Sequence, residues 1–442
     1  MWLLLAAAPT FAQNQATLDL LVKKNIITLD EAAALAKSSA LPATLAGPKD
    51  PNVQSLIIAG LFASQFDWLS TRDKAAGAAN PPAEMQFLFR RAYFGILVDL
   101  GNGWGGDMIF DFAAGAKPPA SYQGGGGNAV QNNFEKIIVT KKIEDWNGQL
   151  AAGYQKVNFT LEEYTSSAIV KPIERSLVAR YFDEYQTSTA PAPNEETNRR
   201  LGFASHHNGI FWDGRFGGTG FFYGTALTTG IQNSTGYTPV GGLNRLAGWV
   251  NAGYNGTFGG DLTGKAGLNL GYSRDGNSNG SQSNSMGGFN PYFSLVYANT
   301  FQLDAEWLEA RVAHGRINGG VASTATPYGF YLTPSYKIND QWELVARFSY
   351  LYTDGRGTNI SDVVLNASNV NGVNTLFNQA QSLYLGLNWN ALGNNIKLLF
   401  GYEWDVFRDR QAGGLAGVIS ASNLTGPRAE VSGVRARVQM LF

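Results

Sequence analysis

The chain has 442 residues, of which only 15% are charged and 12% are aromatic, and it contains 53 glycines. Typical soluble proteins are roughly 25% charged, whereas glycine and aromatic residues are abundant in antiparallel β proteins. The formal net charge of -1 and the lack of cysteine exclude global electrostatic recruitment of nucleic acid, a disulfide framework and a cysteine-ligated metal.

The N-terminus is an apolar run with small residues that ends before the polar residue Gln13. This pattern is typical of the end of a signal peptide cleaved near Ala12, and we predict that residues 1–12 are its remnant. A basic segment that usually precedes such a run is missing, so we expect the true start to lie upstream; the alternative is a disordered apolar tail. No later apolar run reaches about 18 residues, so no transmembrane helix is expected.

Residues 13–52 differ in pattern from everything that follows and are predicted to form a periplasmic leader. Two short helical patterns occur in it, and Thr28 is placed to cap the second one with Glu31 three positions later. A flexible polar leader is the alternative. Residues 38–52, which contain serine, alanine, proline, glycine, lysine and aspartate, indicate a linker.

From residue 53 to residue 442 the chain shows one period-two segment after another, about sixteen in all. An even number is what bacterial membrane barrels require. The predicted strands are 54–68, 86–99, 104–114, 133–144, 147–159, 199–211, 218–230, 243–255, 260–273, 288–298, 300–311, 327–337, 340–353, 379–390, 394–405 and 430–442.

The connections between these segments alternate strictly between short and long. The tight-turn dipeptide Asn255-Gly256, for example, is predicted to begin a short turn over 255–259. Membrane barrels with short periplasmic turns and longer extracellular loops give this alternation, and a soluble sandwich has no reason for it. The long connections are 69–85, 115–132, 160–198, 231–242, 274–287, 312–326, 354–378 and 406–429.

The final strand indicates which face of each strand points to lipid and which points to the lumen. Val434, Val438 and Phe442 share an apolar face, and Arg435 and Arg437 share the opposite one. A soluble protein would turn the apolar face inward, but about sixteen strands enclose a space too wide for a packed core. We therefore predict an all-β fold, an antiparallel transmembrane β-barrel with a lipid-facing apolar surface and a wet, charged lumen.

The segment 160–198 is the longest predicted interior connection. Its first part contains apolar residues such as Ile169, Val170 and Leu177 among charged ones, which makes it too apolar to extend into water. We predict that it folds into the barrel and narrows it; the alternative is an outer loop that packs on a neighbouring subunit.

Basic residues are predicted to line the pathway. Strand alternation places Arg91 inward, and Arg90 on the apolar side, close enough to a strand end to bend inward. Rings of arginine and lysine favour anions, although each base could instead pair with a lumen carboxylate, and the sequence leaves both readings open. The candidate pathway residues are Arg90, Arg91, Lys171, Arg175, Arg180, Arg245, Lys265, Arg347, Arg435 and Arg437.

Several segments, in their order and spacing, give the chain a likeness to a known family. They are the leader Leu18–Lys24, the strand Phe89-Arg90-Arg91-Ala92, the loop from Tyr164 to Leu177, Gly220–Gly224 and the terminal strand. Together they resemble the phosphate-selective porin O and P family of outer-membrane proteins.

The resemblance implies a sixteen-stranded homotrimeric porin in the bacterial outer membrane, whose arginines and lysines guide phosphate or related anions. One loop departs from the family pattern, because the segment Arg274–Gly287 contains a single arginine where phosphate-selective members have several. The sequence therefore predicts passage of small anions in general rather than strict phosphate selectivity.

Enzymatic readings have little support. His206 and His207 are adjacent, so a strand points them to opposite faces, and Gly124–Gly127 lacks the lysine and helix of a phosphate-binding loop. We expect no cofactor, no metal and no enzymatic activity. The predicted function is passive diffusion of small solutes, preferentially anions; the alternatives are a non-selective or carbohydrate-type porin and a plugged structural or adhesive barrel.

Overall fold

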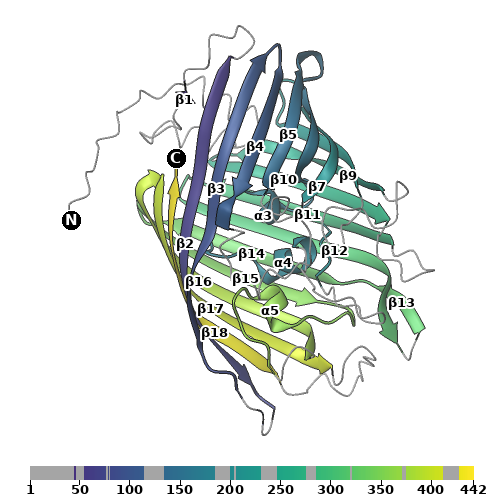
Figure 1. The fold of residues 1–442 in the computed structure, drawn as a ribbon, viewed down its shortest axis with the longest axis vertical. Helices are drawn as coiled ribbons and strands as arrows, with labels where there is room; N and C mark the ends of the chain where they lie inside the picture. The colour runs from purple at the N-terminus through teal and green to yellow at the C-terminus, as the bar shows by residue number, and fades with distance from the viewer. Residues whose placement is uncertain are drawn as a thin grey trace.

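The computed structural model shows a closed antiparallel barrel (Figure 1). It describes residues 44–45, 54–75, 78, 80–113, 134–184, 200–203, 206–229, 246–274, 285–318, 321–370, 375–411 and 428–442. The predicted signal-peptide remnant and leader lie outside the described residues, apart from the two-residue strand β1 (Thr44–Leu45), which pairs with β2.

The barrel wall consists of 16 strands, each antiparallel to its neighbours along the chain. It closes where β18 pairs with β2 in the register Arg435↔Asp67. A short additional strand, β13 (Val321–Ala325), extends the wall beside the end of β12. The wall strands are β2 (Ser55–Asp73), β3 (Glu84–Gly101), β4 (Trp104–Asp111), β5 (Phe134–Ile143), β6 (Gly148–Lys156), β7 (His206–Arg215), β8 (Phe221–Thr229), β9 (Leu246–Gly259), β10 (Leu262–Arg274), β11 (Ser285–Tyr297), β12 (Phe301–Asn318), β14 (Tyr328–Lys337), β15 (Trp342–Tyr352), β16 (Leu376–Asn394), β17 (Ile396–Gln411) and β18 (Ala429–Leu441).

One predicted turn is wrong. Asn255 and Gly256 lie inside β9, paired with Lys265 and Gly264 of β10, and the chain turns only at Gly260. Gly260 has φ of 53°, a backbone conformation that glycine adopts at no steric cost. The dipeptide alone favoured an early turn, but the ladder to β10 continues through it because both strands extend further.

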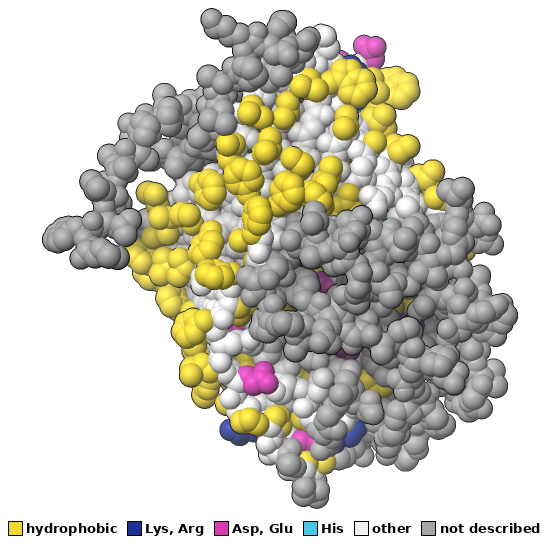
Figure 2. Space-filling model, in the orientation of Figure 1, with side chains coloured by type: hydrophobic (Ala, Val, Ile, Leu, Met, Phe, Trp, Pro, Cys, Tyr) yellow, Lys and Arg dark blue, Asp and Glu magenta, His cyan; other side chains and the backbone are white. Residues whose placement is uncertain are grey.

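The outer surface of the wall is apolar, as the alternation predicts. Figure 2 shows apolar side chains spread over the wall on this face of the molecule. On β18, Val434, Val438 and Met440 are 41–48% exposed, whereas Arg435 and Arg437 on the other face are buried. The predicted facing of the terminal strand is therefore confirmed.

Aromatic side chains border this apolar surface at the end of the barrel where the short turns lie. Aromatic residues concentrate at membrane–water interfaces because their rings are amphipathic. Those that are exposed near the short turns include Trp104, Trp146, Phe216, Phe221, Tyr297, Phe301 and Tyr336.

The short helices of the described residues lie within the barrel outline in Figure 1. They are α3 (Leu161–Tyr164), α4 (Leu177–Asp183) and α5 (Ile360–Val363). The buried residues Phe182 of α4 and Val363 of α5 share one apolar cluster with wall residues such as Leu308 and Leu351. In the described part of the chain, no helix is long and apolar enough to cross a membrane.

Candidate functional site

The segment that follows β6 enters the barrel and is anchored to the wall at its start. Thr160 caps α3, its Oγ1 accepting a hydrogen bond from the Glu163 amide at 3.3 Å. Glu306, which points inward from β12, accepts the amides of Leu161 at 2.8 Å and Glu162 at 2.6 Å. The otherwise unpaired amides of this helical turn are thus satisfied by a wall carboxylate.

The second half of the segment folds back on the first. Ser176 caps α4, accepting from the Ala179 amide at 3.1 Å. The Glu162 carboxylate accepts from the Ser176 amide at 3.0 Å and from its hydroxyl at 2.6 Å. Arg347 of β15 binds the same carboxylate at 3.0 Å. Residues 160–184, which we call the inserted segment, are therefore fixed to each other and to the wall inside the barrel.

Glu174, further along the same segment, is bound by arginines from two wall strands. Arg90 of β3 donates to both carboxylate oxygens, at 2.8 and 2.9 Å, and Arg437 of β18 donates at 2.6 Å. Burial disfavours the charged form of Glu174, but the guanidiniums, Arg437 above all, hold the pKa of Glu174 below its ordinary value. The carboxylate therefore stays ionised at neutral pH.

Arg90 points into the lumen because of a β-bulge. In the β2–β3 ladder Arg91 pairs with Ala63 and Phe89 pairs with Ser64, so Arg90 is an extra residue without a partner. The strand alternation shifts by one at this point. Both Arg90 and Arg91 can therefore face the interior, which simple alternation did not predict for Arg90.

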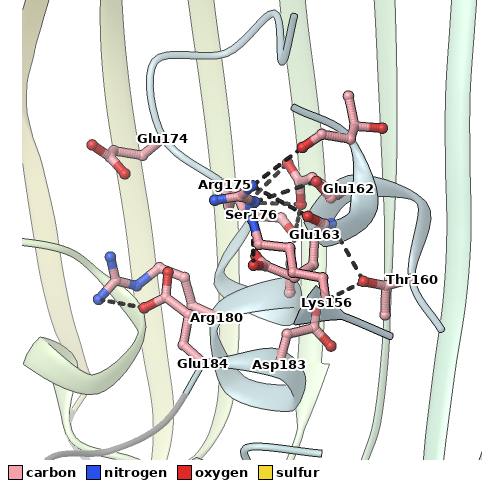
Figure 3. Close-up of polar contacts among 12 residues, drawn as sticks. Lys156, Thr160, Glu162, Glu163, Glu174, Arg175, Ser176, Arg180, Asp183 and Glu184 are labelled. Carbon is pink, nitrogen blue, oxygen red and sulfur yellow. Dashed lines mark hydrogen bonds and ion pairs between the residues drawn. The ribbon is translucent and has the colours of Figure 1, made fainter. Parts of the chain in front are cut away.

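A chain of ion pairs crosses the inserted segment next to Glu174 (Figure 3). Arg175 Nε lies 2.9 Å from one oxygen of Glu163, and Lys156 Nζ lies 3.0 Å from the other. Lys156 also pairs with Glu135 at 3.0 Å. Lys156 is therefore paired with two carboxylates, and one of them, Glu163, is also paired with Arg175.

A small recess opens between the inserted segment and the wall strands β3 and β18. Four arginines line it, and Glu174 is the one carboxylate among its lining residues. We call it the basic recess. Its lining residues are Arg90, Arg91, Ser167, Val170, Ile173, Glu174, Arg175 and Arg437.

Arg91 has the most distant ion-pair partner of these arginines. Its nearest carboxylate, Asp111, lies 4.0 Å away, and its Nη1 donates to the Arg90 carbonyl at 3.0 Å. Its buried Nε has no hydrogen-bond partner among the described residues. The basic recess thus contains a guanidinium with one donor, Arg91 Nε, that no described residue uses.

The remaining candidate residues are mostly engaged elsewhere in the lumen. Arg435 pairs with Glu403 at 2.7 Å and with Asp67 at 3.1 Å. Lys171 pairs with Glu343 at 2.6 Å, and Arg180 with Glu184 at 3.5 Å. These three residues are therefore paired with lumen carboxylates, which is one of the two alternatives that the sequence leaves open.

Lys265 and Arg245 are the last two candidates. Lys265 of β10 lies over the Tyr292 ring, 5.9 Å from its centroid, and lines a different part of the wall. Arg245 lies outside the described residues.

Sequence reasoning missed a second segment that contacts the lumen, between β15 and β16. Arg435 donates to the Leu365 carbonyl at 2.9 Å, and Asn366 donates to Asp67 at 2.6 Å. The available signal was Asn359 followed by Asp362, a capping box that starts α5 within the long connection.

A closed barrel with an apolar outside, and an inserted segment whose charged side chains meet those of the wall, defines an outer-membrane channel. The family model for phosphate-selective porin O and P matches residues 72–412. The chain belongs to this porin family, and its location is the bacterial outer membrane. The family points to a channel rather than an enzyme.

Among the solved structures that share the fold are an outer membrane channel and an anion-selective porin. The outer membrane channel DcaP of Acinetobacter baumannii aligns with TM-score 0.53 and 11% identity, covering 90% of this chain and 100% of that chain. The anion-selective porin from Comamonas acidovorans aligns with TM-score 0.53 and 14% identity, covering 88% and 99%. No curated protein sequence matched the chain.

Proposed function

We propose that this porin passes small solutes by passive diffusion with a preference for anions. The observation that carries the proposal is the basic recess, where four arginines face one carboxylate beside the inserted segment. An anion that enters the recess meets guanidinium donors, and Arg91 Nε among them has no partner among the described residues.

The physical basis is the excess of positive charge at a narrow place. Glu174 neutralises part of the charge of Arg90 and Arg437, so the recess attracts anions without holding them tightly. A channel site must be favourable enough to enter and weak enough to leave. Phosphate and polyphosphate-like anions suit the planar guanidinium fork, and phosphate is the solute that the family description names.

The test is the reversal potential of the purified protein in a planar bilayer under a KCl gradient. Anion preference gives a reversal potential of the sign set by chloride, and cation preference would overturn the proposal. Replacement of Arg91 by glutamine should move the reversal potential toward zero. Partial block of the chloride current by millimolar phosphate, weakened in that variant, would support phosphate as one solute.

The same bilayer experiment also tests the alternative functions that the sequence leaves open. A reversal potential near zero would support a non-selective or carbohydrate-type porin, and no conductance would support a plugged structural barrel. The homotrimer is likewise a proposal that rests on family resemblance. Crosslinking of the folded protein in detergent tests it, and a band of monomer mass alone would contradict it.

A further inference from the structure

Exposed basic side chains gather on the outer surface of the barrel at one end of β17, β18 and β2, which lie side by side (Figure 1). Arg72 of β2 is opposite Glu430 of β18 in the strand register. Two residues further along each strand, the Lys74 amide donates to the Arg428 carbonyl at 2.8 Å. Arg408 follows the last pair of β17 with β18 and therefore lies next to Arg428. We call this group the outer basic patch; its residues are Arg72, Lys74, Arg408 and Arg428.

Strand alternation places the patch outside the barrel. All four of its side chains are exposed, whereas Asp73 and Ala429, on the alternate positions between them, are buried. Trp68 shares the face of Arg72 on β2 and is 45% exposed. The outer basic patch is therefore separate from the lumen and from the basic recess.

The patch lies just beyond a set of aromatic side chains at the extracellular side of the wall. Trp68 and Tyr402 lie in one row of the β17–β18–β2 ladder, and Trp404 lies in the next row outward. The row that follows contains Arg72 and Glu430. Exposed aromatic rings mark the membrane–water interface, and long connections mark the extracellular end of a barrel. The patch is therefore at the level of the lipid head groups of the outer leaflet.

Positive charge exceeds negative charge in the patch. The Glu430 carboxylate lies 3.1 Å from Lys74 Nζ and 2.8 Å from Arg428 Nη2. Even in these ion pairs the side chains of Lys74 and Arg428 are 40% and 49% exposed. Four accessible bases thus face one carboxylate among the described residues of this surface.

The neighbouring carboxylates are turned away from the outer surface. Asp73 is buried and pairs with Arg410. Asp409 is also buried and accepts a hydrogen bond from Gln379 at 2.6 Å. Glu430 is therefore the carboxylate that limits the charge of the patch.

The concentration of bases is local. Near the same end of β3, β5, β9 and β15, the outward positions carry Phe87, Phe134, Leu246 and Tyr352. A general need for solubility at the rim would distribute charge around the whole barrel. Bases on three neighbouring strands instead indicate a particular anionic partner.

We propose that the outer basic patch binds the phosphorylated head group of an outer-leaflet lipid such as lipid A. Clusters of lysine and arginine at a membrane surface attract anionic head groups. The guanidinium forks of Arg72 and Arg408 match the oxygens of a phosphate monoester. The rings of Trp68 and Trp404 lie where the acyl chains of such a lipid begin. Because the patch is outside the lumen, lipid binding is independent of the anion preference of the channel.

Native mass spectrometry of the full-length protein in detergent measures the binding of added lipid A and of chemically dephosphorylated lipid A. The phosphorylated form is expected to bind more tightly. Arg72→Gln combined with Arg408→Gln removes two of the four bases. This variant should weaken binding of the phosphorylated form by about tenfold or more and leave the dephosphorylated form unchanged.

Glu430→Gln tests the same idea in the opposite direction. It removes the carboxylate that pairs with Lys74 and Arg428, so binding of phosphorylated lipid A should become about fivefold tighter. Because this variant is expected to gain affinity, it keeps the test valid if the double variant fails to fold. Heat modification in unboiled gels checks the folding of each variant.

The matched control is Arg311→Gln. Arg311 is an exposed base on the outer face of β12, which lies away from β17, β18 and β2 in the sheet. This variant is expected to keep the wild-type affinity for phosphorylated lipid A. An equal loss in this control and in the double variant would mean that the outer basic patch is not a specific site.

Three further results would overturn lipid binding at the patch. The first is equal affinity for phosphorylated and dephosphorylated lipid A. The second is displacement of the lipid by millimolar inorganic phosphate, which would indicate a site for free phosphate. The third is loss of subunit association in the double variant with unchanged lipid binding, which would make the patch a contact between subunits. The reversal potential tests anion preference separately and should be unchanged in all these variants.

Discussion

Arg437 and Glu174 are 263 residues apart in the sequence, and their side chains meet at 2.6 Å inside the barrel. The arginine comes from the last strand and the glutamate from the segment after β6, so closure of the barrel and docking of the inserted segment are coupled. The pair is buried, with side chains 6% and 5% exposed. Buried ion pairs cost much when one partner is removed, so this contact offers a direct test of the site.

Glu174→Gln should increase anion preference. The change removes the negative charge from the basic recess but keeps a side chain that can accept a hydrogen bond from Arg90. At about 8 Å in water, one charge changes the energy of an ion by about 0.5 kcal/mol, or roughly twofold in partition. We expect the chloride-to-potassium permeability ratio to rise about twofold, measured as a reversal potential. An unchanged ratio would place the basic recess off the ion pathway.

The docking of the inserted segment should depend on acid pH through Glu174. Because the arginines lower its pKa from 4.5, the ion pairs stabilise the docked segment fully above that value. The stabilisation is lost as pH falls through the lowered pKa. Open-channel current noise should stay constant from pH 7 to about 4.5 and rise below it. Glu174→Gln lacks this titration, so a similar acid response in that variant would assign the effect to another group.

The alternation of apolar and polar residues explains which parts of the fold could be predicted from the sequence. Each strand has an apolar and a polar face, so the wall and the exposure of residues such as Val438 could be predicted. A bulge is a local event that leaves no trace in the alternation. Parity therefore places Arg90 on the apolar side, with bending near a strand end as its route inward, whereas in the structure the bulge turns it inward. The prediction of a turn at Asn255-Gly256 is wrong because the length of β9 depends on its pairing with β10, which the sequence pattern does not show.

The candidate site was less predictable for a physical reason. The positions of Arg347, Arg435 and Arg437 follow from strand parity, but their partners depend on how the inserted segment folds. The Glu162 carboxylate that binds Arg347 lies 185 residues away in the sequence. Single-sequence patterns report local periodicity and not such contacts, so the distinction between paired and available arginines required the structure.

Gly401→Ala should destabilise the wall next to the inserted segment. A Cβ at this position would lie 2.4 Å from the ring of Tyr384, whose hydroxyl accepts the Ile173 amide at 3.3 Å. Tyr384 is 1% exposed and has little room to move, so we expect a loss of about 1–3 kcal/mol. The temperature at which the folded band is lost in unboiled gels measures it. Gly248→Ala is the matched control, because no atom lies within 4 Å of its Cβ position.

Asp183→Asn should stabilise the folded protein at neutral pH. Burial, followed by the charges of Glu163 and Glu306, raises the pKa of Asp183 well above 3.8. Between 3.8 and the raised pKa the unfolded chain releases this proton and the folded chain keeps it, so stability falls as pH rises. Asparagine removes this dependence and can still accept from Thr160, which donates to Asp183 at 2.9 Å. At pH 7, the folded band of the variant in unboiled gels should persist to a higher temperature than that of the wild type. A lower temperature would contradict the raised pKa of Asp183.

Leu385→Arg should impair membrane insertion far more than Leu392→Arg. Both leucines are exposed on the outer surface of β16, at 51% and 52%, so the two substitutions change the same face of one strand. Leu385 pairs with Ala346 and Tyr402 in the middle of the wall, whereas Leu392 lies beside Ile396 next to a short turn. Arginine costs about 2–4 kcal/mol at the midplane of the bilayer and about 0–1 kcal/mol near its surface. Refolding into lipid vesicles under a urea titration measures both costs. Equal losses would mean that the membrane does not surround the wall at the level of Leu385.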